Sequence, residues 1–357
     1  MKREKSRPTE FMNEIKFQHV YFYKKEKKKI VPVDDLIQIE KAKAKLLLIH
    51  ENLLSELPTI FRENWDVVSL YNPAGDANKA NAILLNPNDG AYDLKNRLNH
   101  LTGKQWIKFS CSWFVFNALA SDIAEERAAD PSADNHPATF SPTMISNFIS
   151  FFTKEGESVF DPFMGIGTTL VAARRTKRIG FGVELNFDFF STALKRCPEY
   201  KANMWNSSIE HFNIESLPAI DFSISSPPYW DVLNRSTKDF RKKRENRDLN
   251  STYSDADDDL GNISEYSEFI SRLVDVYIKV GSRLRPKGFL VVIVKNVKKE
   301  GKLFPLAWDL AKELSEHFEL KDERIWIQDK VALAPYGYPH SWTSNILHHY
   351  CLVFQKQ

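Results

Sequence analysis

The stretch Ser158-Val-Phe-Asp-Pro-Phe-Met-Gly-Ile-Gly-Thr-Thr169 joins a short apolar strand to a glycine-containing turn and then to a helix. Glycines in such a turn let the backbone approach a ligand closely, and the first turn of the helix offers free N–H groups. The third glycine of the dinucleotide-binding fingerprint is missing, so the turn alone is a weak signal. It predicts a strand–turn–helix unit of an α/β protein that binds a nucleotide-like ligand.

A second predicted strand ends in a carboxylate. Residues 178–185 read Arg-Ile-Gly-Phe-Gly-Val-Glu-Leu, which places Glu184 at the end of the strand after the helix. An acidic residue at this place in a nucleotide-binding βαβ unit accepts hydrogen bonds from ribose hydroxyls. The alternative is a solvated charge at a strand end, and the glycine-rich turn upstream favours the ligand role.

A rigid lip follows a later strand. Residues 219–225 have strand composition and run directly into Ser226-Pro-Pro-Tyr-Trp230. Proline cannot continue a ladder and restricts the residue before it to extended geometry, so the chain leaves the sheet at once. Such a lip suits a planar base, because Ser226 and the Pro227 carbonyl can accept hydrogen bonds from an amino group while Tyr229 stacks. For these residues alone, an ordinary strand-ending turn is the alternative.

Together, these motifs resemble the S-adenosylmethionine-dependent DNA methyltransferases that modify exocyclic amino groups. The similarity extends to His-Pro-Ala-Thr-Phe-Ser-Pro at 136–142, to a helical stretch at 143–152, and to residues 335–345 and 348–354. It covers the chain from about residue 104 onward. The resemblance implies S-adenosylmethionine as cofactor and a Rossmann-like class I methyltransferase fold. That fold is α/β, with a seven-stranded, mostly parallel sheet whose last strand is antiparallel, and here it carries an N-terminal accessory module.

The resemblance also implies the site residues. The catalytic group is Ser226, Pro227, Pro228 and Tyr229. The cofactor group is Phe140, Asp161, Phe163, Gly165, Gly167, Thr168, Glu184, Asn206 and Ser207. The family usually has Gly-Asp after the third strand, which is expected here at 201–204. This chain has Asn206-Ser207 instead, so its adenine contact must come from an amide, a hydroxyl or the backbone.

The implied chemistry is methyl transfer to a flipped base. An exocyclic amino nitrogen is conjugated with its ring, and hydrogen bonds to Ser226 and Pro227 would favour a tetrahedral nitrogen with developing positive charge. The base must leave the duplex to reach the methyl group. In this family, serine at the first position of the lip tends to accompany cytosine N4 methylation and aspartate adenine N6 methylation. We therefore expect cytosine N4, with adenine N6 as the alternative.

Other functions stay open or are disfavoured. An RNA methyltransferase could share this fold and lip, and a non-catalytic DNA-binding subunit with a decayed site is an alternative from another class. Ser226 counts against a protein glutamine methyltransferase, which usually has Asn-Pro-Pro-Tyr. Cytosine-5 methyltransferases need a cysteine in a Pro-Cys context, whereas this chain has Cys197-Pro198.

Charge distribution says more about DNA than the net charge of +2. Basic residues cluster just after the lip, and we expect them and Trp230 to contact DNA: Arg235, Lys238, Arg241, Lys242, Lys243, Arg244 and Arg247. There they could neutralise phosphates, although charge runs are usually solvated loops. The expected partner is double-stranded DNA, and a cognate restriction endonuclease or defence-system subunits remain open, as in restriction-modification or phage defence.

The remaining sequence sets the layout. We expect an accessory module at 1–105 and a catalytic domain at 106–357, with a basic DNA-contacting excursion at 231–262. A helix is expected from Asp34 or Asp35 to about Leu57, and a linker at 120–135. No apolar window is long enough for a membrane span, and no signal peptide is evident. Three scattered cysteines are typical of a reducing cytoplasm and argue against a zinc site, so no metal is expected.

Overall fold

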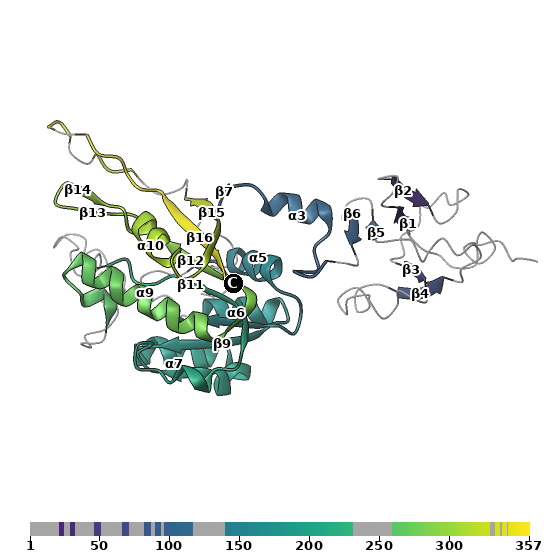
Figure 1. The fold of residues 1–357 in the computed structure, drawn as a ribbon, viewed down its shortest axis with the longest axis horizontal. Helices are drawn as coiled ribbons and strands as arrows, with labels where there is room; N and C mark the ends of the chain where they lie inside the picture. The colour runs from purple at the N-terminus through teal and green to yellow at the C-terminus, as the bar shows by residue number, and fades with distance from the viewer. Residues whose placement is uncertain are drawn as a thin grey trace, which may run out of the picture. The chain divides into compact units, whose positions relative to one another are not determined.

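The computed structural model describes residues 21–24, 29–32, 46–50, 66–70, 82–86, 90–93, 96–116, 140–230, 259–328, 333–335, 338–340 and 342–357 (Figure 1). The chain divides into two units, Met1–Ser110 and Cys111–Gln357. The expected linker at 120–135 and the basic residues 235–247 lie outside the described residues. Within the described part, no helix is long and apolar enough to cross a membrane.

The first unit contains two small sheets. Strands β1 (Tyr21–Lys24), β2 (Lys29–Pro32), β5 (Ala82–Asn86) and β6 (Gly90–Asp93) form an antiparallel sheet in the order β2-β1-β5-β6. Strands β3 (Leu46–His50) and β4 (Asp66–Leu70) pair in parallel. Helix α3 (Gly103–Phe109) begins with a capping box between Thr102 and Gln105.

Strand β3 contradicts the predicted helix over residues 46–50, and the rest of that predicted helix lies outside the described residues. Leu46-Leu-Leu-Ile is a continuous apolar run, and such a run lacks the helical period and fits a buried strand equally well. Pairing with β4 decides between the two conformations.

The second unit is built on one eight-stranded sheet. Its strands are β7 (Trp113–Val115), β8 (Ser158–Asp161), β9 (Ile179–Glu184), β10 (Met204–Asn206), β11 (Ile220–Ser225), β12 (Leu284–Val294), β15 (Glu319–Ile327) and β16 (His348–Gln355). They lie in the order β10-β9-β8-β11-β12-β16-β15-β7. Only β16 is antiparallel to its neighbours in this sheet.

This strand order confirms the predicted class I methyltransferase fold. Leaving β7 aside, the seven remaining strands, numbered along the chain, read 3-2-1-4-5-7-6, and the seventh is antiparallel. The eighth strand, β7, was not predicted, because Trp-Phe-Val at 113–115 is too short to show an alternating pattern of apolar and polar residues. Its strand conformation is defined by its pairing with β15. The third strand begins at Met204 rather than at Lys201, since Pro198 opens a 3-10 turn over Pro198–Asn203.

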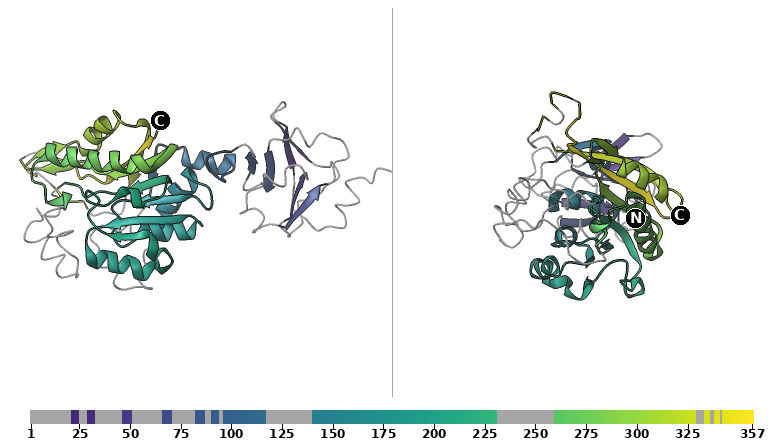
Figure 2. Two further views of the ribbon diagram at one scale, coloured as in Figure 1. Left: turned by 60° about the horizontal axis from the view of Figure 1, so that its bottom comes forward. Right: turned by 90° about the vertical axis from the view of Figure 1, so that its left-hand side faces the viewer.

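Helices cover both faces of this sheet (Figures 1 and 2). Helix α5 (Pro142–Phe152) packs on α6 (Thr168–Arg175), and α6 and α7 (Phe187–Arg196) contact β8, β9 and β10. Helix α9 (Tyr266–Arg283) packs on α10 (Leu306–Leu314), and this pair contacts β12 and β16. A short hairpin of β13 (Val297–Lys299) and β14 (Lys302–Phe304) follows β12.

The fold places a ligand crevice at the carboxyl edge of the sheet. The connections reverse direction between β8 and β11, which are adjacent in the sheet. In open α/β sheets, ligands bind outside the carboxyl ends of the strands at such a switch point. Asp161 ends β8 and Ser225 ends β11, so the two sequence motifs meet there.

Candidate functional site

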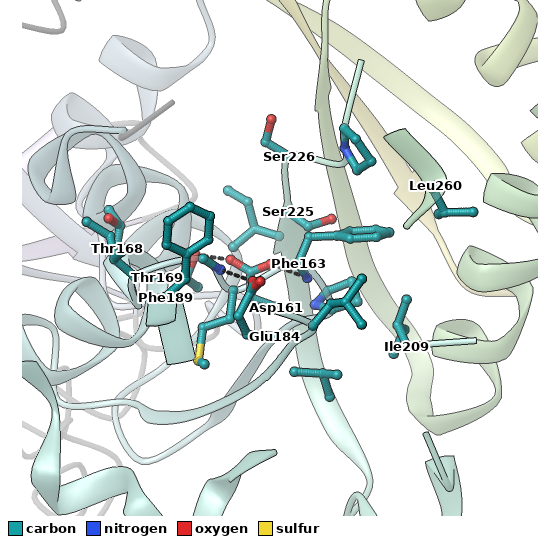
Figure 3. A pocket seen from close by; sticks show the side chains of 18 of the residues that line it. Asp161, Phe163, Thr168, Thr169, Glu184, Phe189, Ile209, Ser225, Ser226 and Leu260 are labelled. Atoms are coloured by element: carbon teal, nitrogen blue, oxygen red, sulfur yellow. Dashed lines mark hydrogen bonds between the residues drawn. The ribbon is translucent and has the colours of Figure 1, made fainter. Parts of the chain in front are cut away.

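A cavity of about 1060 Å³, its open mouth included, lies at this switch point. Figure 3 shows Asp161 and Glu184 side by side near its centre, Ser226 on its upper rim, and Ile209 and Leu260 across from Thr168 and Phe189. Most predicted cofactor residues line it: Phe140, Asp161, Phe163, Gly165, Thr168, Glu184 and Ser207. Ser226 and Pro228 of the lip line the same cavity.

Asp161 is held at the end of β8 by two local hydrogen bonds. The backbone N–H of Phe163 donates to Oδ1 (3.0 Å), and the Thr169 hydroxyl donates to Oδ2 (2.5 Å). The side chain is 5% exposed, and this burial raises the pKa of the carboxyl to about 6 although both hydrogen bonds lower it. Thr169, which was not singled out, therefore fixes the orientation of the predicted site residue.

Glu184 ties the second strand to the glycine turn. The Gly165 N–H donates to Oε2 (2.7 Å) and the Asn186 N–H donates to Oε1 (2.8 Å). Burial raises the pKa of Glu184 to about 7, against these two hydrogen bonds, and the nearby Asp161 and Asp259 carboxyls raise it further. Each carboxylate oxygen has a second lone pair, so the carboxylate can still accept two ligand hydroxyl groups.

The two glycines of the turn have different roles. Gly165 lines the cavity with φ 55°. Gly167 is the N-cap of α6 with φ 84°, and a Cβ there would lie 3.1 Å from Cβ of Ala193. Gly167 is not among the lining residues of the cavity, so it serves conformation and helix packing rather than ligand contact.

Of the two residues predicted to contact the adenine, Asn206 and Ser207, only Ser207 lines the cavity. The Asn206 side-chain amide donates to the carbonyls of Glu184 (2.8 Å) and Leu185 (2.9 Å), and this residue does not line the cavity. Asn206 thus holds two neighbouring loops together instead of facing the ligand. Ser207 and Ile209, which follow it, do line the cavity.

Apolar side chains that the sequence did not single out complete the walls of the cavity. They are Leu185, Phe189, Ile209 and Leu260, and Asp259 lies beside Leu260. Asp259 also N-caps the 3-10 turn Leu260–Asn262, where its Oδ1 accepts the Gly261 N–H (2.8 Å). Ile209 is an isolated apolar residue in the polar stretch after the third strand, and this pattern could have marked it as a residue of the cavity wall.

The lip is ordered by hydroxyl pairs. Ser226 Oγ and Tyr229 Oη lie 2.9 Å apart, and Ser225 Oγ and Tyr277 Oη are also 2.9 Å apart. Tyr277 is fully buried, and burial raises its pKa well above the usual value, so it is a neutral phenol. Pro227 and Tyr229 do not line the cavity itself, although Tyr229 is linked to it through Ser226.

Trp230 does not present a surface to DNA in this structure. Its indole is 3% exposed and packs against Tyr266 (5.0 Å between ring centroids) and Phe304 (4.7 Å), with Lys299 Nζ 4.5 Å from the ring centroid. The expectation that Trp230 contacts DNA is therefore corrected. An aromatic residue after Pro-Pro can turn outward or into the core, and α9 together with the β13–β14 hairpin provides an apolar site for it.

An aromatic row connects the cavity with the lip. The ring of Phe140 lies 5.3 Å from Trp326, Trp326 stacks on His349 (4.4 Å, 23°), and His349 lies 5.9 Å from Tyr229. Burial lowers the pKa of His349 to about 3, helped by the charge of Lys295, so the imidazole is neutral. Its Nδ1 is buried and has no hydrogen-bond partner within the described residues. Trp326 lies on β15 and His349 on β16, and neither was predicted as a site residue.

The fold and this site define a class of protein. A class I methyltransferase sheet carries one cavity that is lined by two acidic residues, by Gly165 of the glycine turn and by Ser226 and Pro228 of the lip. The sequence profile of the DNA methylase family matches residues 3–195, which is more than half of the chain. The chain therefore belongs to the DNA methylase family.

Curated relatives agree over shorter segments. The chain is 34% identical over 76 residues to the orphan methyltransferase M.BamHII of Bacillus amyloliquefaciens, covering 21% of this chain and 29% of that protein. It is 39% identical over 66 residues to the type II methyltransferase M.Cfr9I of Citrobacter freundii (18% and 22%). It is 34% identical over 83 residues to the type II methyltransferase M.HindIII of Haemophilus influenzae (23% and 27%). The matches thus span less than a third of each relative.

Solved structures are more distant. TrmN from Thermus thermophilus matches with a TM-score of 0.38 and 14% identity over 62% of this chain and 50% of that chain. A methyltransferase from Pyrococcus furiosus matches with a TM-score of 0.37 and 16% identity over 66% and 94%. The assignment of the fold rests on the strand order rather than on these scores.

S-adenosylmethionine is the cofactor of this family, and the chemistry of the cavity fits it. Glu184 offers carboxylate lone pairs suited to ribose hydroxyls, and Asp161 offers a carboxylate suited to an ammonium group. Leu185, Ile209 and Leu260 supply an apolar surface for a planar base. The cavity therefore holds polar and apolar groups of the kinds that this cofactor requires.

Proposed function

We propose that this protein methylates the exocyclic amino group of a flipped base in double-stranded DNA, with cytosine N4 as the acceptor. One observation carries the proposal: Ser226 and Pro228 line the same cavity as Glu184 and Gly165. A methyl donor held by the acidic residues and the glycine turn would thus share one space with an amino group held at the lip. Membership in the DNA methylase family supports DNA as the substrate.

At the donor end, we assign binding of the ribose to Glu184 and of the amino-acid end to Asp161, Phe163 and Gly165. The two backbone N–H donors on Glu184 hold its carboxylate in place before the ligand arrives. This arrangement reduces the ordering cost of binding. When bound, S-adenosylmethionine supplies an electrophilic methyl group on a sulfonium.

At the acceptor end, Ser226 Oγ and the Pro227 carbonyl accept hydrogen bonds from the two N–H groups of the base. These bonds free the nitrogen lone pair from conjugation, and they strengthen as positive charge develops on the nitrogen. The Tyr229 hydroxyl, 2.9 Å from Ser226 Oγ, fixes the serine rotamer. The freed lone pair would then be directed at the methyl group of the bound cofactor, and the methylated nitrogen would release a proton.

The choice of cytosine rests on Ser226. A neutral hydroxyl can accept one hydrogen bond from the amino group, and in this family serine at the first lip position tends to accompany cytosine. Phe140 lines the cavity near the lip, and the buried Trp326 packs behind it. We assign Phe140 to the wall against which the flipped base stacks.

Ser226→Ala tests the assignment. We expect methyl transfer to plasmid DNA to fall by about two to three orders of magnitude, as when one transition-state hydrogen-bond partner is lost. Cofactor affinity should be unchanged. Ser223→Ala is the matched control, because Ser223 lies on β11 just before the lip and donates to the Phe160 carbonyl in the core (3.0 Å). Equal turnover of Ser226→Ala and the wild type would contradict the proposed role of the lip.

A further inference from the structure

Two aromatic side chains on the segment between β15 and β16 are almost completely exposed. Tyr338 is 81% exposed and Trp342 is 88% exposed, and the nearby Leu333 is 69% exposed. Burying a large aromatic side chain is normally favourable, and Trp and Tyr are the residues most enriched where a protein meets a partner. The described residues of this segment, 333–335, 338–340 and 342–347, are here called the aromatic arm.

The arm is held in place by defined contacts. Asn345 bridges its two sides, because its amide donates to the Ala334 carbonyl (2.8 Å) and its carbonyl accepts the Ala334 N–H (3.0 Å). Lys298 on β13 donates to Thr343 Oγ1 (2.7 Å) and Ser344 Oγ (3.2 Å), as well as to the Ser344 carbonyl. The arm is thus braced against the β13–β14 hairpin.

The arm stands at the edge of the sheet that carries the lip. Strand β15 is parallel to β12 and β11, since β16 lies antiparallel between β12 and β15. The arm leaves β15 at its carboxyl end, the hairpin follows the carboxyl end of β12, and Ser226 follows that of β11. Figure 1 shows the yellow arm and the β13–β14 hairpin extending from the same end of the unit.

The hairpin adds positive charge beside the aromatic residues. It carries Lys298, Lys299 and Lys302 against one acidic residue, Glu300. Exposed aromatic faces next to lysines match a nucleic acid, which offers stacked bases flanked by phosphates. An apolar protein partner would instead favour a continuous apolar surface without this charge.

We propose that the aromatic arm contacts the DNA duplex beside the flipped nucleotide, with Trp342 and Tyr338 stacking on bases that flipping exposes. The exposed Lys302 of the hairpin lies against the flanking phosphates, and Lys298 holds the arm to the hairpin. This inference rests on the proposed function, since only an enzyme that flips a base exposes such stacking faces. It adds a DNA contact outside residues 1–105 and 231–262, the two segments that the sequence offers for DNA recognition.

The test compares Trp342→Ala, Tyr338→Ala and the double variant with the wild-type full chain. The probe is a fluorescein-labelled 30-base-pair duplex of mixed sequence with one central abasic position, which provides an opening in the base stack. Stacking of one base corresponds to a change of about five- to hundredfold in affinity. We expect losses in this range for each single variant, with S-adenosylmethionine affinity and thermal midpoint unchanged. Leu320→Ala, a 43% exposed position at the opposite end of β15, is the control.

A second variant separates position from contact. Lys298→Met keeps both aromatic residues but removes the contacts to Thr343 and Ser344, and it should weaken binding less than the double aromatic variant. Wild-type affinity and wild-type methyl transfer in the double variant would overturn the inference while leaving the proposed function intact. If the wild-type chain transfers no methyl group to DNA, the proposed function fails. If its arm variants then bind DNA normally but lose a protein partner, the inference fails as well.

Discussion

Glu184 should make the cofactor-free protein less stable as the pH rises from 5 to 8. Burial raises the pKa of this carboxyl from 4.5 to about 7. Below pH 4.5 the folded and unfolded chains both bind the proton. Between 4.5 and 7 only the folded chain keeps it, so stability falls with rising pH and levels off above 7. Over this range the free energy of unfolding should fall by at most roughly 3 kcal/mol. This figure is an upper limit because Glu184 is only partly buried and faces the cavity.

Cofactor binding should show the opposite dependence on pH. Ribose hydroxyls donate hydrogen bonds to the ionised carboxylate, so binding favours loss of the Glu184 proton. As the pH rises toward 7, the dissociation constant should therefore fall by up to about tenfold for each pH unit. Above pH 7 it should level off. Asp161, with a pKa of about 6, contributes in the same direction at lower pH.

Titration calorimetry with S-adenosylmethionine from pH 5.5 to 7.5 measures this dependence. Glu184→Gln should weaken binding by roughly tenfold or more at pH 7.5, since a hydrogen bond to a charged group contributes about 1.5–3 kcal/mol. It should also lose most of the slope, whereas the exposed control Glu316→Gln should keep it. A pH-independent affinity in the wild type, or an unchanged slope in Glu184→Gln, would refute the reasoning.

Three further outcomes follow from the geometry. Gly167→Ala should lower the free energy of unfolding by about 1–3 kcal/mol in urea titrations, because φ is 84° and Ala193 is close. Gly156→Ala is the control for backbone strain alone, since Gly156 has φ 80° and nothing within 4 Å of the position that an added Cβ would take. Tyr229→Phe should reduce methyl transfer by about tenfold at unchanged cofactor affinity, since it removes only the hydroxyl beside Ser226; a larger loss of cofactor affinity than of turnover would contradict this. Tyr277→Phe should destabilise the fold by about 1 kcal/mol, because it leaves the buried Ser225 hydroxyl without this partner.

Much of the catalytic unit could be predicted from the sequence because its signals are local. The glycine turn, the strand ending in Glu184 and the strand ending at Ser226 each combine a short apolar run with a backbone constraint from glycine or proline. These constraints act within a few residues, so they do not depend on the rest of the fold. The seven-stranded, mostly parallel sheet with its antiparallel last strand was expected from the family resemblance.

The parts that were missed depend on contacts between distant segments. Asn206 holds the Glu184 and Leu185 carbonyls, Trp230 packs under the β13–β14 hairpin, and His349 stacks on Trp326 of the neighbouring strand. The direction in which such side chains turn is decided by what packs against them. Gly167 was predicted to contact the ligand, because its packing against Ala193 on the next helix could not be seen in the sequence.

Nucleoside mass spectrometry can detect methyl transfer to an exocyclic amino group of DNA. DNA would be incubated with the full chain and S-adenosylmethionine carrying a deuterated methyl group, then digested to nucleosides. We expect labelled N4-methylcytosine, and Ser226→Ala should reduce its amount by about two to three orders of magnitude. Labelled N6-methyladenine would correct only the choice of base. Label at cytosine C5, or label in RNA but not in DNA, would rule out the proposed function.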